Sequence, residues 1–127
     1  MPNSSPRILI VDDDANITYA FKLGLERRGF LVDVFNDTDE MLDKVEPDAY
    51  DVAIFDFRMP KKNGVELYRE FRKLNSETPI CFFTALDLAE QVPLEVNPDI
   101  KAHTIIKKPV SIAGLAEILQ EIIESTS

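Results

Sequence analysis

Five polar residues could form one chemical site, because each lies directly after a short strand-like run. They are Asp12 and Asp13 after 8–11, Asp56 after 52–55, Thr84 after 80–83, and Lys108 after 104–107. If carboxylates from two such runs approach within ~4 Å, each pair repels by about 4 kcal/mol at an effective dielectric of 20, so a cluster requires a cation. An all-oxygen site with room for water and a phosphate suits Mg²⁺ better than zinc or copper.

The other two residues of the set extend this chemistry to phosphate. Lys108 supplies a positive charge and Thr84 a hydroxyl, and both suit phosphoryl oxygens. Taken singly, each residue also has a plain structural explanation: an Asp after a strand often caps the next helix, as we expect of Asp14. Asp56 is different, because the next helix begins too far along the chain for it to cap. The combination therefore favours a phosphoryl site.

The elements that must position these residues alternate along the chain. Apolar runs predict strands at 8–11, 31–35, 52–55, 80–83 and 104–107. The stretches between them have helical character, which predicts five βα units and a parallel sheet with helices on both faces. In such a sheet the loops after the strands meet at one edge, where sites form. The polar residues above are expected at that edge.

Local signals mark where the helices begin and end. Apolar residues at three-and-four spacing predict helices over 17–25, 41–45, 65–74 and 112–123. Gly29 is placed to end the first, Asp37 with Glu40 to begin the second, and Ser111 to cap the last. Between 86 and 103, Pro93 and Pro98 leave room only for a short helix at 88–92. The fourth helix is therefore expected to be short or irregular.

Composition narrows the class of protein. The chain has 127 residues, 45% hydrophobic and 29% charged, which is typical of one soluble globular domain. It contains no apolar run of membrane-spanning length and no visible secretory signal, so we expect a cytoplasmic protein without membrane insertion. The net charge of -9 opposes direct binding to nucleic acid. The single cysteine, Cys81, lies in an apolar run and is expected to be a buried, inert thiol.

In this order, these residues resemble the receiver domain of two-component response regulators, from Arg7 to Glu124. The resemblance is carried by 8–13, by 51–56 with Met59-Pro60 and Gly64, and by Thr84-Ala85 and Lys108-Pro109. It implies a doubly wound, flavodoxin-like α/β fold with five parallel strands in the order 2-1-3-4-5 and five helices. It also implies that 1–127 is a single receiver domain, with its core at 7–124 and no output domain.

The resemblance further implies roles for the acidic residues. Asp56 would be the phosphoacceptor. Asp13 would bind Mg²⁺ directly, Asp12 mainly through water, and Arg58 through its backbone carbonyl, with Mn²⁺ as a substitute ion. Such a domain would catalyse its own phosphorylation and would not turn over small molecules.

The basic and hydroxyl residues have implied roles as well. Lys108 would pair with the acceptor carboxylate and then with the phosphoryl group, and its peptide bond to Pro109 would be cis. Thr84 would donate a hydrogen bond to a phosphoryl oxygen. Arg58 and Leu86, two residues beyond Asp56 and Thr84, would affect the lifetime of the phosphorylated state. Since neither is an acid or an amide, we predict slow self-dephosphorylation.

The donor implied by the resemblance is a sensor histidine kinase or a histidine-containing phosphotransfer protein, and the target is a downstream protein. The family also uses phosphorylation-linked homodimers, formed on a face that includes the fourth helix. Ile105 stands where the family commonly has tyrosine or phenylalanine, so the aromatic switch cannot occur here in its usual form. Pro93 and Pro98 are expected to alter the recognition face.

Two other functions remain open from the sequence. A phosphatase of the haloacid-dehalogenase type also begins with an apolar strand and Asp-x-Asp, as at Asp12 and Asp14. That chemistry requires a later acidic motif, yet 109–116 contains no acid, and Asp56 would have no role. A receiver-fold protein that binds partners without phosphorylation is the second alternative, suggested by Ile105. The presence of all five active-site groups argues against it.

Overall fold

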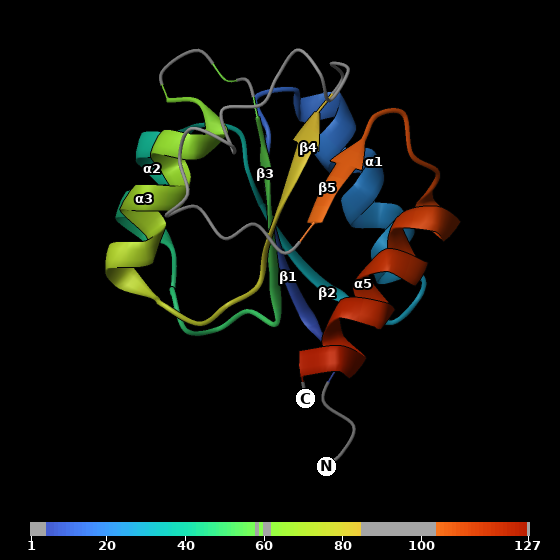
Figure 1. Ribbon diagram of the computed structural model, residues 1–127. Coiled ribbons are helices and arrows are strands. Elements are labelled where there is room, and N and C mark those ends of the chain that lie inside the picture. The colour runs from blue at the N-terminus through green and yellow to red at the C-terminus, as the bar shows by residue number, and fades with distance from the viewer. Residues whose placement is uncertain (1–4, 58, 60–61, 85–103, 127) are drawn as a thin grey trace.

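Five parallel strands form one sheet in the order β2-β1-β3-β4-β5, as predicted (Figure 1). The computed structural model describes residues 5–57, 59, 62–84 and 104–126. The strands are β1 (Arg7–Val11), β2 (Leu31–Phe35), β3 (Val52–Asp56), β4 (Ile80–Thr84) and β5 (Thr104–Lys107). The helices are α1 (Ala15–Glu26), α2 (Thr38–Lys44), α3 (Gly64–Leu74) and α5 (Ile112–Thr126). The helix predicted at 88–92 lies outside the described residues.

The helices cover both faces of the sheet. In Figure 1, α2 and α3 lie on one side and α1 and α5 on the other. Successive strand residues point to opposite faces, so Ile8 and Ile10 pack with α1 and α5, while Leu9 and Val11 pack with α2 and α3. All five residues of the central strand β3 are buried. This burial on both faces explains why the strands appear in the sequence as continuous apolar runs.

Side-chain caps fix where the helices begin. The Asp14 carboxylate accepts hydrogen bonds from the backbone N–H groups of Asn16 and Ile17, at 3.0 and 3.3 Å. Asp37 caps α2 in the same way, and the Ser111 hydroxyl accepts from the Gly114 N–H at 2.9 Å. These three predicted caps are confirmed. Beyond α1, Gly29 has a φ of 97°, a conformation that glycine adopts without steric penalty.

The start of α3 has a capping box that our sequence analysis did not predict. The Asn63 side chain accepts from the Glu66 N–H, and the Glu66 side chain accepts from the Asn63 N–H, at 2.9 and 3.0 Å. The pattern Asn-x-x-Glu before an apolar helix face was the signal that could have revealed it. The cap matters for the site because α3 begins just after the loop that follows β3.

The structure also tests the predictions made for the single cysteine and for membrane-spanning segments. Cys81 is buried on β4 and forms no disulfide, as expected. Among the helices in the described part of the chain, none is long and apolar enough to cross a membrane.

A partly buried hydrogen bond at the amino-terminal half of the sheet is expected to make stability depend on pH. The Tyr50 hydroxyl donates to the Asp33 carboxylate at 2.7 Å, and Arg7 binds the same oxygen at 3.0 Å. Burial raises the pKa of the Tyr50 hydroxyl, and the hydrogen bond and charge of Asp33 raise it further. Above a pH of about 10, the unfolded chain loses this proton while the folded chain keeps it, so the free energy of unfolding falls as pH rises.

Tyr50→Phe is therefore expected to lower the free energy of unfolding by about 1–2 kcal/mol at pH 7, because a hydrogen bond to a charged acceptor is lost. The difference from the wild type should shrink above pH ~10. Urea denaturation at pH 7 and at higher pH measures both effects. Tyr19→Phe is the control, since Tyr19 is 63% exposed. An unchanged difference across the pH range would contradict the assigned role of the hydroxyl.

Candidate functional site

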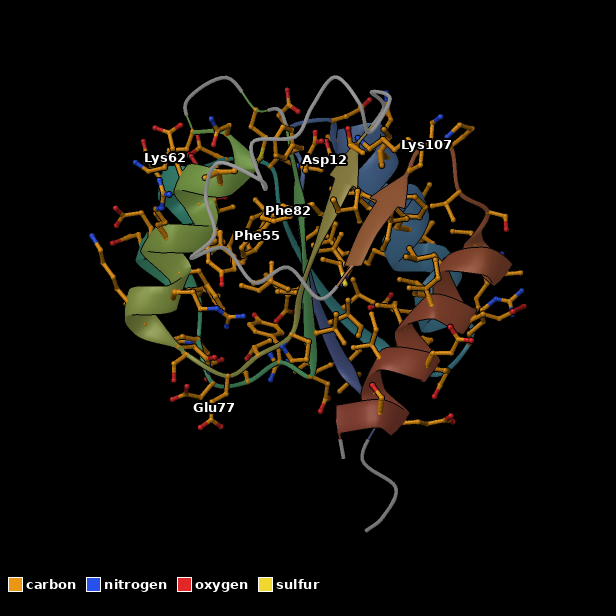
Figure 2. All side chains as sticks on the ribbon, in the orientation of Figure 1. Asp12, Phe55, Lys62, Glu77, Phe82 and Lys107 are labelled. Carbon is orange, nitrogen blue, oxygen red and sulfur yellow. The ribbon has the colours of Figure 1, made fainter. Side chains whose placement is uncertain are left out.

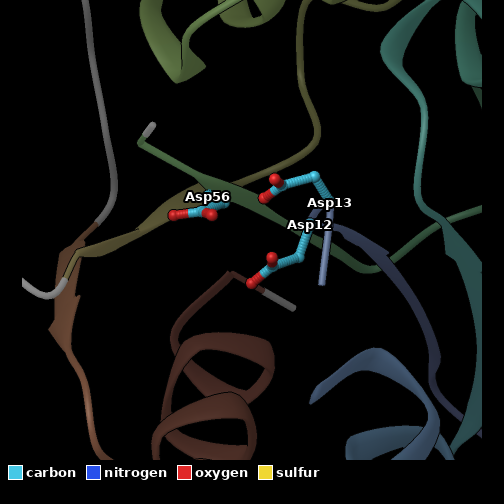
Figure 3. A group of neighbouring side chains, drawn as sticks. All are labelled: Asp12, Asp13 and Asp56. Carbon is cyan, nitrogen blue, oxygen red and sulfur yellow. The ribbon is translucent and has the colours of Figure 1, made fainter. Parts of the chain in front are cut away.

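Three carboxylates from two strand ends meet at the carboxyl-terminal edge of the sheet. One oxygen each from Asp12, Asp13 and Asp56 lies within 4.8 Å of the others, and Figure 3 shows the three side chains gathered at one place. Asp12 and Asp56 are buried, with 0% and 7% exposure, whereas Asp13 is exposed. The parallel pairing of β1 with β3 brings the two loops together. The structure thus places these residues in one cluster, as expected.

Lys108 supplies positive charge to this cluster. Its ammonium lies 2.9 Å from an oxygen of Asp12 and 3.6 Å from an oxygen of Asp56. The resemblance implied pairing with the acceptor carboxylate, but the shorter ion pair is with Asp12. Burial lowers the pKa of Lys108, yet the hydrogen bond and charge of Asp12, together with the charge of Asp56, outweigh it and raise the pKa above that of an ordinary lysine. Lys108 is therefore cationic at neutral pH.

An aromatic pair lies under the lysine. The Lys108 ammonium is 5.7 Å from the centre of the Phe83 ring, and Phe83 stacks on Phe21 of α1 at 5.4 Å. The Lys108 N–H also donates to the Thr84 carbonyl at 2.7 Å. The peptide bond between Lys108 and Pro109 is cis. The end of β4 therefore positions the lysine through both side chain and backbone, while the buried Thr84 ends the same strand.

Close backbone packing positions Asp56. The Phe57 N–H donates to the Phe83 carbonyl at 2.8 Å, and the Gly64 N–H donates to the Phe57 carbonyl at 2.9 Å. A Cβ atom on Gly64 would lie 2.8 Å from the Asp56 carbonyl oxygen. A side chain here would push the first turn of α3 away from the acceptor strand. This close approach explains why the loop after the acceptor strand has a glycine at position 64.

The residue after β2 also reaches the site, which our sequence analysis did not predict. The side-chain amide of Asn36 donates to the Asp12 carbonyl at 2.8 Å and to the Thr18 hydroxyl at 2.9 Å. The Asp12 N–H donates to the Phe35 carbonyl at 3.1 Å. The signal was available in the sequence, because Asn36 follows an apolar run as the five predicted residues do. The predicted helix start named only the next residue, Asp37, as a cap.

Four further residues were predicted to affect switching or the lifetime of the phosphorylated state. Arg58 and Leu86 lie outside the described residues. Ile105 is half-buried on β5, paired with Phe82 of β4, and Pro109 is exposed after the cis bond. Their roles in switching stay predictions.

The donor set suits a hard divalent cation. Among the described residues, the cluster offers three carboxylates, whose oxygens fit Mg²⁺ or Mn²⁺. Both oxygens of Asp12 already have protein partners: Lys108 binds one, and the Asp14 N–H donates to the other at 2.9 Å. This arrangement is compatible with the expected role of Asp12 through water.

Figure 2 places Asp12 and Lys107 at the edge of the sheet opposite Glu77. The fold and this acidic edge together define a doubly wound α/β protein with its site at the strands' carboxyl ends. Residues 8–120 match the family model of the response regulator receiver domain. The chain belongs to that family.

Similar proteins support the assignment. The transcriptional regulatory protein RprY of Bacteroides fragilis is 34% identical over 92% of this chain and 49% of its own length. The response regulator MprA of Mycobacterium bovis is 30% identical over 96% of this chain and 52% of its own length. The chain thus spans about half the length of these curated relatives. A CheY-like receiver domain from Methanospirillum hungatei has a TM-score of 0.85 and 31% identity, covering 97% of both chains.

Proposed function

We propose that this domain is a phosphoacceptor switch, in which Asp56 receives a phosphoryl group in a Mg²⁺-dependent reaction. The observation that carries the proposal is the meeting of Asp12, Asp13 and Asp56 with the cationic Lys108. Three carboxylates and one ammonium leave a net negative site, which favours a divalent cation. The site then has the charge needed to accept a phosphoryl group.

The proposed reaction is an in-line displacement on phosphohistidine. An oxygen of Asp56 attacks phosphorus, a P–O bond forms as the P–N bond breaks, and the imidazole leaves with the electron pair and takes up a proton. Lys108, 3.6 Å from the acceptor carboxylate, can follow the negative charge onto the phosphoryl oxygens. Thr84 ends the neighbouring strand and is proposed to hydrogen-bond one of those oxygens. Asp13 and Asp56 would hold the Mg²⁺, which would supply positive charge beside the transferred group.

We propose that the phosphoryl donor is a sensor histidine kinase or a histidine-containing phosphotransfer protein. Phosphorylation is proposed to change a protein-binding surface that a downstream protein recognises. Support comes from the family of the chain and from the position of Asp56 at the carboxyl-terminal end of the central strand β3. A phosphorylation-linked homodimer is part of the same proposal.

Incubation with Mg²⁺ and a small acyl phosphate tests this function. We expect the mass of one phosphoryl group to be added, and a chelator to prevent the addition. A protein that gains no mass under these conditions would instead fit the phosphorylation-independent binding module. Sustained hydrolysis of a small phosphoester would favour the phosphatase.

Mg²⁺ is also expected to stabilise the folded protein. An ion that binds only the folded state raises the free energy of unfolding by RT ln(1 + [Mg²⁺]/Kd), which is about 2.7 kcal/mol at a concentration 100 times Kd. Thermal unfolding in chelator and in increasing Mg²⁺ measures the effect. The control is Asp13→Asn, which leaves the partly buried Asp12–Lys108 pair in place and should reduce the shift. Equal melting temperatures with and without Mg²⁺ in the wild type would contradict the metal site.

A further inference from the structure

The Asn36 amide joins the end of β2 to the loop that carries two of the candidate metal ligands. Its Nδ2 group donates to the Asp12 carbonyl at 2.8 Å and to the Thr18 hydroxyl at 2.9 Å. Thr18 is 1% exposed, and its hydroxyl donates in turn to the Ala15 carbonyl at 3.2 Å. The three groups form a chain of hydrogen bonds from β2 across the β1–α1 loop into the first turn of α1.

The carbonyl that Asn36 holds belongs to the peptide bond between Asp12 and Asp13. A peptide unit is planar, so holding its oxygen limits rotation of the whole unit. The Asp12 N–H is held as well, by the Phe35 carbonyl at 3.1 Å. Residues Phe35 and Asn36 therefore fix the backbone on both sides of Asp12. The directions in which the two carboxylates project depend on this backbone.

Within the described part of the chain, Asn36 makes no side-chain contact with another structural role. It does not cap α2, because the Asp37 carboxylate accepts from the Asp39 and Glu40 N–H groups. Its side chain is not part of either apolar cluster, and the residue as a whole is exposed. The two hydrogen bonds that its amide donates go to the segment that positions the acidic cluster.

We propose that Asn36, supported by Thr18, is a positioning residue of the metal site. It orients the Asp12–Asp13 peptide so that both carboxylates face Asp56 before the ion binds. The inference rests on the proposed function of this site. Without the amide, the Asp12–Asp13 peptide becomes ordered only when the ion binds. The free-energy cost of this ordering then lowers the affinity for the ion. Partners that orient metal ligands typically change affinity by about 10–100-fold when removed.

Asn36→Ala tests the inference. Mg²⁺ is titrated into the unphosphorylated variant, and its affinity is measured by calorimetry or from backbone amide NMR shifts. We expect binding to weaken by about 10-fold, the lower end of that range. Saturating Mg²⁺ should restore the rate of phosphorylation by acyl phosphate, because Asp56 and Lys108 are unchanged. Thr18→Val, which keeps the shape and removes the hydroxyl, should weaken binding in the same direction but less.

Asn75→Ala is the matched control at the opposite end of the sheet. The Asn75 side chain also makes bonds to the backbone, accepting from the N–H groups of Glu77 and Thr78 at 2.8 Å, and it donates to Asp48. We expect its removal to destabilise the fold without changing Mg²⁺ affinity. Equal affinities of Asn36→Ala and the wild type, or equal weakening in Asn36→Ala and Asn75→Ala, would overturn the inference. Absence of Mg²⁺ binding in the wild type would overturn the proposed function instead.

Discussion

Asp56→Asn is expected to abolish phosphoryl incorporation from both acyl phosphate and a phosphohistidine donor. The amide keeps the shape of the side chain but lacks the anionic oxygen that attacks phosphorus. The same change should stabilise the metal-free protein by about 1–2 kcal/mol. That gain is smaller than the ~4 kcal/mol of repulsion between two carboxylates ~4 Å apart at an effective dielectric of 20, because Lys108 already offsets part of this repulsion. Removing the acceptor thus removes activity and raises stability together.

Intact-protein mass spectrometry and urea denaturation in chelator measure these two effects. Asp51→Asn is the matched control, because Asp51 precedes β3 and its carboxylate accepts from the Arg7 N–H at the other end of the sheet. An amide oxygen can also accept there, so phosphorylation and stability should change little. Phosphoryl incorporation that persists in Asp56→Asn at the wild-type rate would move the acceptor to another residue.

Lys108→Met is expected to slow phosphorylation by about 10²–10³-fold, the usual effect of losing one group that stabilises developing negative charge. It should also lower the stability of the metal-free protein by about 3 kcal/mol, because the Asp12 side chain is 1% exposed and would lose its ion-pair partner. Mg²⁺ should stabilise this variant more than the wild type, since the added cation would restore the missing charge.

Rates of acyl-phosphate labelling and unfolding curves with and without Mg²⁺ test the prediction. Lys107→Met is the control. Lys107 is the exposed residue on β5 next to Lys108, and its loss removes the same positive charge. Its loss should leave the rate within a few-fold of the wild type. If Lys108→Met were as stable as the wild type in chelator, Asp12 would not depend on this lysine.

The opposite signs of the two variants follow from one charge balance. Asp56→Asn removes an anion from a site with excess negative charge, and Lys108→Met removes the cation that offsets it. A double variant is expected to recover part of the stability lost in Lys108→Met. Because the residues are in contact, their effects should not be additive.

Much of this protein could be predicted from local sequence alone. Strands buried on both faces require continuous apolar residues, which is why the runs at 8–11 and 52–55 marked β1 and β3 correctly. Caps are also local, so Asp14 and Ser111 were predicted at the right helix starts. The acidic cluster followed because parallel strands bring their carboxyl ends to one edge.

Only the tertiary structure decided which of these groups touch. Lys108 is 96 residues from Asp12, and their 2.9 Å ion pair depends on the positions of β1, β3, β4 and β5 in the sheet. The Asn36 amide reaches a carbonyl 24 residues away through the pairing of β1 with β2. Residue type and spacing determine which groups reach the edge of the sheet. Strand order, register and side-chain direction decide the partner of each one, because a hydrogen bond depends on a few tenths of an ångström that no local pattern encodes.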